Sequence, residues 1–143
     1  LPVGNVGEVI CASPAYIQKH GAIKSLHDLT SQRWIAAPWQ NGTVKLFKNS
    51  KLSEQLELDV HFCAQTNTLP SALEMAINDM GIALLPEFVL QTELANGRLV
   101  RVLSSHQGRQ WPFYLVHRFQ GEKPIHITRF YQLIKHFFAK ASV

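Results

Sequence analysis

NTLPSALEMAINDMGIALLP, residues 67–86, joins an amphipathic helix to a buried strand. Apolar residues at helical spacing predict the helix, and Thr68 has the chemistry of its N-cap. Gly81 is predicted to take the left-handed conformation that ends the helix. The apolar run 82–85 then predicts a strand, and Pro86 begins another helix. The helical stripe consists of Leu69, Ala72, Leu73, Ala76, Ile77 and Met80.

The rest of the chain alternates between predicted strands and helices. Ser13 and Ser25 have the chemistry of N-caps, and Pro124 begins a closing helix with a strong apolar stripe. The polar residues 49–57 predict a loop with at most one helical turn. Because several strands are apolar throughout, they indicate a sheet covered on both faces, which is α/β architecture rather than a β-sandwich. Further strands are predicted at residues 8–12, 33–37, 44–48, 59–64, 98–103 and 112–117.

Length and composition fit one compact domain, since 46% of the 143 residues are hydrophobic. The net charge of +4 comes from Lys and Arg residues spread along the chain, which favours a solvated surface over a nucleic-acid groove contact. No apolar run reaches the roughly 18–20 residues that span a bilayer, and Leu1 does not begin a signal peptide. We therefore expect a soluble chain without membrane contact. The missing initiator Met fits a fragment of a longer protein.

The sequence offers little support for catalysis or metal binding. Cys11 and Cys63 lie in apolar runs without a second Cys or a His at ligand spacing, so reduced thiols are expected, with a disulfide between them left open. The seven histidines form no HExxH pattern. Gly-x-Ser-x-Gly and phosphate-binding glycine loops are also missing from the sequence. We expect no enzyme activity, no metal site and no cofactor.

A candidate ligand site follows the predicted strand 59–64. In α/β sheets, ligands bind beyond the carboxyl ends of strands, next to helix N-termini that attract anions. Thr66 and Thr68 offer hydroxyls, Asn67 an amide and Leu69 a backbone N–H, which together suit a carboxylate or another small polar anion. The alternative is that these residues only cap the helix and form a turn, and one residue can do both.

A second candidate segment, residues 37–42, follows the strand that contains WIAA. Trp39 could stack on a flat ligand, and Gln40 or Asn41 could orient it. The alternative is that Trp39 packs beneath its own loop. Arg109 and Arg118 could attract an anion, although lone arginines near loops are usually surface charges. The candidate residues of this segment are Pro38, Trp39 and Gln40.

Four motifs resemble the effector-binding domain of LysR-type transcriptional regulators. They are CASPAYIQKHGAIKSLHDL at 11–29, MGIALLPEFV at 80–89, NGRLVRVL at 96–103 and WPFYLVHR at 111–118. Their order and spacing match that family over nearly the whole chain. The resemblance implies a bilobal fold like that of periplasmic binding proteins, in which two Rossmann-like subdomains hold the effector between them. In this family the loop equivalent to 37–42 borders the cleft.

The resemblance also implies how the chain is organised. Residues 33–103 would form the second subdomain, and residues 104–143 would return to complete a first subdomain that is incomplete here. The family's winged helix-turn-helix and linker helix would lie upstream of Leu1. The implied function is to sense a small-molecule effector and to form a homodimer or homotetramer, with DNA bound only through the missing N-terminal domain.

Two other functions remain open at this point. A solute-binding protein of a transport system has a similar bilobal architecture, and it would differ in what precedes Leu1. An enzyme built on the same scaffold would need catalytic residues from distant loops, and it would turn over a bound metabolite.

Overall fold

A computed structural model describes residues 1–141 of the chain. The chain forms two compact units. Residues 7–109 make up the larger unit, and residues 1–6 together with the chain from Gln110 onward make up the smaller one. The predicted subdomain boundaries, 33–103 and 104–143, remain a prediction.

The larger unit is built on a mixed sheet with the strand order β5-β2-β6-β1-β7. Strand β2 pairs in parallel with its neighbours β5 and β6, whereas β1 runs antiparallel to β6 and β7. Residues from distant parts of the sequence therefore meet at each end of the sheet. The strands are β1 (Pro2–Ala12), β2 (Trp34–Ala36), β5 (Phe62–Gln65), β6 (Ile82–Pro86) and β7 (Val100–Arg101).

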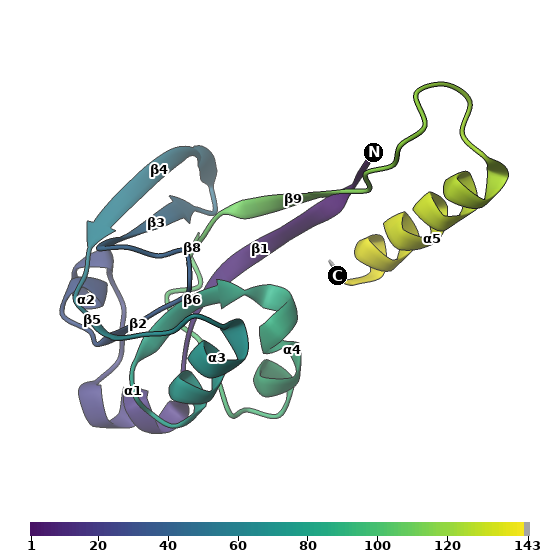
Figure 1. The fold of residues 1–143 in the computed structure, drawn as a ribbon. Coiled ribbons are helices and arrows are strands. Elements are labelled where there is room, and N and C mark those ends of the chain that lie inside the picture. Colours follow the sequence, from purple (N-terminus) through teal and green to yellow (C-terminus); the bar gives the residue numbers. More distant parts are fainter. Residues whose placement is uncertain (142–143) are drawn as a thin grey trace. The chain divides into compact units, whose positions relative to one another are not determined.

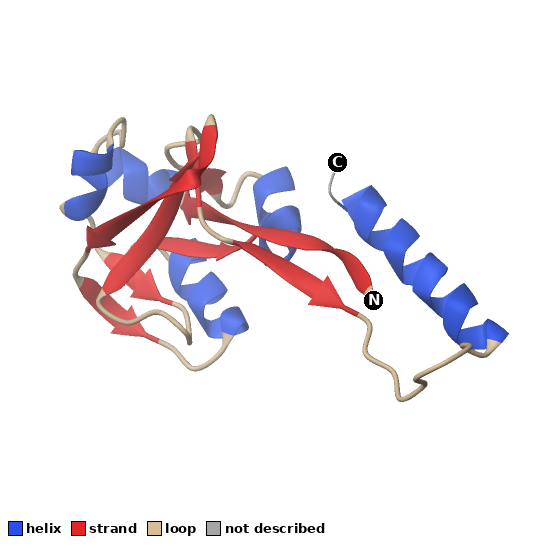
Figure 2. Cartoon of the chain, turned by 90° about the horizontal axis from the view of Figure 1, so that it is seen from above, coloured by secondary structure: helices blue, strands red, loops and turns tan. Residues whose placement is uncertain are grey.

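Helices cover both faces of this sheet, as the apolar strands predicted (Figures 1 and 2). Successive side chains of a strand point to opposite faces, so each central strand contributes to two cores. Ala83 and Leu85 pack in the core that contains residues of α3 (Leu69–Ile77) and α4 (Glu87–Ala95). Ile82 and Leu84 pack in the opposite core, with residues of α1 (Pro14–His20) and α2 (Leu26–Thr30).

A β-hairpin, β3 (Thr43–Lys48) and β4 (Lys51–Asp59), adds a second sheet to this unit, with β8 (His106–Gln107) on the other side of β3. The prediction of a loop at residues 49–57 is wrong, because most of that segment belongs to β4. The strand is polar because it lies at an edge, where backbone pairing to β3 holds it and its side chains stay mostly exposed. Val44 and Leu46 anchor the hairpin in the core.

The stretch 67–86 folds as predicted at its start and differently at its end. Thr68 caps α3 and accepts a hydrogen bond from the Ser71 N–H at 3.2 Å. The helix ends at Ile77, and Asp79 rather than Gly81 takes the positive φ, at 65°. Glycine is needed at position 81 for a different reason, since a Cβ there would collide with the carbonyl oxygen of Arg33. Position 81 therefore requires a glycine, but the left-handed conformation predicted for Gly81 is wrong.

Other local predictions hold with shifted boundaries. Ser13 caps α1, and Ser25 and Asp28 form the capping box at the start of α2. The predicted strand 98–103 is only the two residues of β7, because the chain turns away beyond Arg101. The strand predicted at 112–117 is β9 (Gln110–Tyr114).

The smaller unit contains the start of β1, the strand β9 and the helix α5 (Ile125–Ala141). Leu1 and Leu115 exchange backbone hydrogen bonds of 2.7 and 3.0 Å, and the hydroxyl of Tyr131 on α5 donates to the Pro2 carbonyl at 2.7 Å. The apolar stripe predicted for the closing helix remains largely exposed, with Leu133 at 64% and Phe137 at 69% exposure.

Candidate functional site

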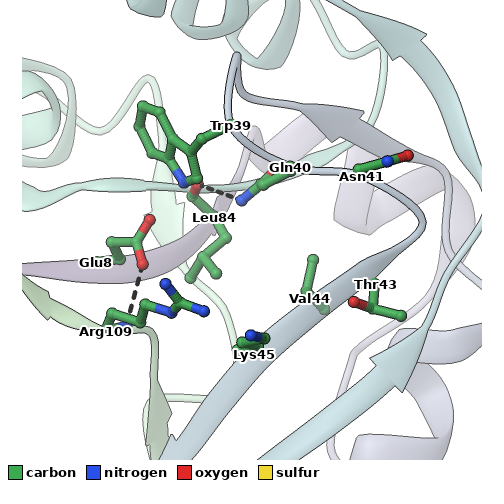
Figure 3. A pocket seen from close by; sticks show the side chains of 9 residues that line it. All are labelled: Glu8, Trp39, Gln40, Asn41, Thr43, Val44, Lys45, Leu84 and Arg109. Atoms are coloured by element: carbon green, nitrogen blue, oxygen red, sulfur yellow. Dashed lines mark hydrogen bonds between the residues drawn. The ribbon is translucent and has the colours of Figure 1, made fainter.

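A pocket of about 220 Å³ lies in the larger unit, where β2 and β6 end (Figure 3). The loop after β2 forms one wall, the hairpin strand β3 forms another, and the segment around Arg109 a third. Carboxyl ends of parallel strands are the usual location of ligand sites in α/β sheets. The pocket is lined by Glu8, Trp39, Gln40, Asn41, Thr43, Val44, Lys45, Leu84 and Arg109.

Backbone hydrogen bonds hold Arg109 beside Glu8. The Glu8 N–H donates to the Arg109 carbonyl at 3.2 Å, and the Gly108 N–H donates to the Glu8 carbonyl at 2.9 Å. The Arg109 N–H donates to Glu8 Oε1 at 3.0 Å, as Figure 3 shows. A Cβ at Gly108 would lie 2.6 Å from the Glu8 Cβ, so the two backbones can approach this closely only with glycine there. Glu8 is 2% exposed and fixes the position of Arg109.

Gln40 holds the loop after β2 in place. Its Oε1 accepts a hydrogen bond from the Ala37 N–H at 2.9 Å, and its Nε2 donates to the Leu84 carbonyl at 3.2 Å. Both ends of the amide therefore contact the backbone of this unit. The loop leaves the neighbouring indole of Trp39 at the pocket, with 43% of its surface exposed.

The hairpin contributes Thr43, Val44 and Lys45 to the pocket. Val44 is 1% exposed and ties this wall to the core. The Lys45 Nζ lies 3.9 Å from Glu57 Oε1 on the paired strand β4, a partly exposed ion pair that contributes little to stability. Lys45 and Arg109 give the pocket two positive side chains, and Glu8 gives it a negative one.

The two cysteines of the larger unit lie outside the pocket lining. Burial raises the pKa of the Cys11 thiol to about 12, which keeps it protonated. Cys11 and Cys63 are free thiols on strands separated by β2 and β6, so about 14 Å of strand spacing rules out the disulfide that the sequence left open. Within residues 1–141, no three His, Cys, Asp or Glu residues are grouped to hold a metal ion, and no helix has the length and hydrophobicity to cross a membrane.

The family model of the LysR substrate binding domain matches residues 1–139. The chain belongs to this family. Two curated relatives are transcriptional regulators by name. The probable HTH-type transcriptional regulator LtrA of Klebsiella pneumoniae is 29% identical over 77% of this chain and 37% of its own length. The HTH-type transcriptional regulator PtxR of Pseudomonas aeruginosa is 22% identical over 90% of this chain and 41% of its own length.

Solved structures of LysR-type regulators share the fold. Full-length AphB of Vibrio cholerae aligns with a TM-score of 0.79 at 20% identity, over 96% of this chain and 47% of that chain. The regulatory domain of CrgA from Neisseria meningitidis aligns with a TM-score of 0.69 at 19% identity, over 94% of this chain and 66% of that chain. The predicted periplasmic-binding-protein-like α/β fold is therefore confirmed. The chain spans about two fifths of the length of the curated relatives that it matches.

The structure places the two predicted segments of this LysR-family domain at the same edge of the sheet. Trp39 and Gln40 line the pocket, with Asn41 beside them, and Pro38 is exposed next to it. The segment 66–69 does not line the pocket, and its contact with an effector stays a prediction. Thr66 Oγ1 donates to the Thr68 carbonyl at 2.9 Å and lies 3.5 Å from the Ala36 carbonyl oxygen, which connects the segment to the end of β2.

The sequence did not point to Glu8 or Lys45, and it left Arg109 open between an anion contact and a surface charge. The available signal for Glu8 was a carboxylate at the start of the apolar run EVICA, where a charge needs a structural reason. Arg109 follows a glycine, but only the pairing of residues 108 and 109 with β1 shows why that glycine matters.

Proposed function

We propose that this chain is the effector-binding part of a LysR-type transcriptional regulator. The observation that carries the proposal is a small cationic pocket at the carboxyl ends of β2 and β6, in a domain of the LysR substrate-binding family. The effector would be a small molecule that contacts Trp39 and the two cations, with the segment 66–69 contributing from the same edge. The chain would bind and sense this molecule rather than convert it.

The position of Arg109 supports a coupling between effector binding and conformation. The chain passes between its two compact units at residues 6–7 and 109–110. Glu8 and Arg109 stand directly beside these two crossings and are hydrogen-bonded to each other. An effector bound to Arg109 would therefore contact the chain next to the crossing at residues 109–110. Through Glu8, it would also affect the chain next to the crossing at residues 6–7. The coupling requires that the effector bind two arrangements of the protein with different affinities.

DNA binding would belong to a part of the regulator that this chain does not cover. Both curated relatives carry HTH-type in their names and are more than twice as long as the matched region. The regulator would form a homodimer or homotetramer in the cytoplasm, where it meets DNA. On this chain, α4 is a candidate dimer face, since its Phe88 is 52% exposed. The proposed role needs neither cofactor nor metal.

The solute-binding alternative is not retained. The curated relatives are named as transcriptional regulators, and they share this domain over most of its length. The sequence upstream of Leu1 in the source DNA gives a direct test. A helix-turn-helix pattern is expected there, and a signal peptide followed by a complete first lobe would contradict the regulator.

A ligand screen tests the sensing role on the chain itself. Thermal melting is measured against a panel of organic acids, amino acids, sugars, nucleosides and amines, and each hit is repeated with Trp39→Ala. We expect at least one hit that raises the melting temperature of the natural sequence and that Trp39→Ala weakens. Tyr114→Ala is the matched control, because it removes an exposed aromatic outside the pocket. A panel without any hit would contradict an effector pocket at this place.

A further inference from the structure

The charges around the pocket restrict the kind of effector it can take. Lys45 and Arg109 contribute two positive charges and Glu8 one negative charge, so the charged lining sums to +1. Glu57, 3.9 Å from Lys45, reduces the positive charge on the hairpin side further. The pocket therefore offers at most one net positive charge to a ligand, which a single carboxylate satisfies. A second carboxylate would meet the field of Glu8, which burial leaves poorly screened by water.

Arg109 is the better placed of the two cations to anchor that carboxylate. Three hydrogen bonds between Glu8 and the segment 108–109 fix the backbone from which the Arg109 side chain extends into the pocket lining. A guanidinium can also bind a carboxylate through two parallel N–H donors, which gives a fixed orientation. Lys45 offers a point charge on the opposite wall.

The uncharged lining mixes apolar side chains, among which the indole of Trp39 offers a flat face, with the polar side chains of Gln40, Asn41 and Thr43. The indole of Trp39 keeps 43% of its surface exposed, and Leu84 and Val44 also line the pocket. A flat apolar ligand body would cover the indole and gain stacking energy. A volume of about 220 Å³ lies below the roughly 300–1,000 Å³ of pockets for drug-sized ligands, which limits the body to a small molecule.

We propose that the effector is a small monocarboxylate with a flat apolar body, anchored on Arg109 and stacked on Trp39. This inference rests on the proposed sensing role and gives it a ligand class. Glu8 acts as a positioning residue that holds Arg109 and disfavours a second negative charge. Lys45 adds attraction for the anion at the hairpin wall.

Three matched probes test the ligand class by titration calorimetry on the natural sequence. Benzoate carries one carboxylate on a flat ring, benzamide has the same shape without the charge, and phthalate carries a second carboxylate. We expect benzoate to bind roughly tenfold or more tightly than either of the other two. Equal binding of benzamide, or tighter binding of phthalate, overturns the proposal. If none of the three compounds binds, the proposed ligand class is also wrong. The sensing role would still hold if a compound of another chemical class in the metabolite panel raised the melting temperature.

Variants of the two cations test the anchoring. Arg109→Gln is expected to weaken benzoate roughly tenfold and to leave benzamide unchanged, and Arg109→Lys should recover part of the loss. Lys45→Gln should weaken benzoate less than Arg109→Gln does. Matched controls are Arg101→Gln and Lys51→Gln, which remove ion-paired cations outside the pocket. If both Arg109→Lys and Arg109→Gln fold and bind benzoate as tightly as the natural sequence, Arg109 is not part of the site.

Discussion

At the amino ends of β2 and β6 the chain binds itself, whereas at their carboxyl ends it leaves charged and aromatic side chains around a pocket. At the amino end, the Ile82 N–H donates to the Arg33 carbonyl at 2.8 Å, and the Tyr16 hydroxyl bonds to Gln32 and Arg33. At the carboxyl end, Trp39 is 43% exposed and Lys45 and Arg109 line a pocket. One end of the sheet is therefore closed by its own contacts, and the proposed binding site lies at the other.

The largest loss of stability is expected from Gly81→Ala at the amino end. The new Cβ would collide with the Arg33 carbonyl oxygen, which is backbone and cannot rotate away. We expect the free energy of unfolding to fall by about 3 kcal/mol, measured by urea denaturation. Gly121→Ala is the control, because no atom lies within 4 Å of its Cβ position. A stable Gly81→Ala variant would mean that the two strands can separate there without cost.

Tyr16→Phe should give the next largest effect at the same end. The hydroxyl donates to Gln32 Oε1 at 2.8 Å and accepts from the Arg33 N–H at 3.1 Å, so its removal leaves both groups without this partner. We expect a loss of about 1–2 kcal/mol in the free energy of unfolding. Tyr114→Phe, at 61% exposure, should change stability little. The folded Tyr16→Phe variant should bind benzoate with unchanged affinity. A large change would contradict the separation of the stabilising contacts at the amino end from the pocket at the carboxyl end.

Thr68→Ala tests the segment at the carboxyl end that the pocket does not include. The loss of the N-cap hydrogen bond to Ser71 should cost about 1 kcal/mol, measured by denaturation. Thr68→Ser keeps the cap and should restore stability. If the segment 66–69 also contacts the effector, Thr68→Ala weakens effector binding as well. Unchanged effector affinity would limit Thr68 to capping and would place the site at the pocket alone.

Trp39→Ala should have a clear effect on binding and a modest effect on stability. Because the indole is 43% exposed and more than half of its surface is covered, we expect the free energy of unfolding to fall by about 1 kcal/mol. Benzoate affinity should fall roughly five- to tenfold with the loss of stacking, measured by calorimetry. A large loss of stability would instead show that the indole packs beneath its loop.

The sequence anticipated one candidate loop better than the other features of the site. Trp39, Gln40 and Asn41 follow an apolar strand, and that position alone predicted a place at the carboxyl edge of the sheet. The role of Gln40 was not predictable, because its amide bonds to Ala37 nearby and to Leu84 on another strand. The hairpin strand β4 was missed because an edge strand is held by backbone pairing and carries few apolar residues.

By itself, the sequence determined the α/β class, the caps at Ser13, Ser25 and Thr68, and the family, because each depends on local chemistry or on the order of motifs. Only the tertiary structure decided that Glu8, Lys45 and Arg109 share a pocket with Trp39. These residues lie on four separate segments, and their meeting depends on strand order and on the close approach of Gly108 to Glu8. Such long-range pairing leaves no periodic trace in the sequence, since it is set by how the elements pack.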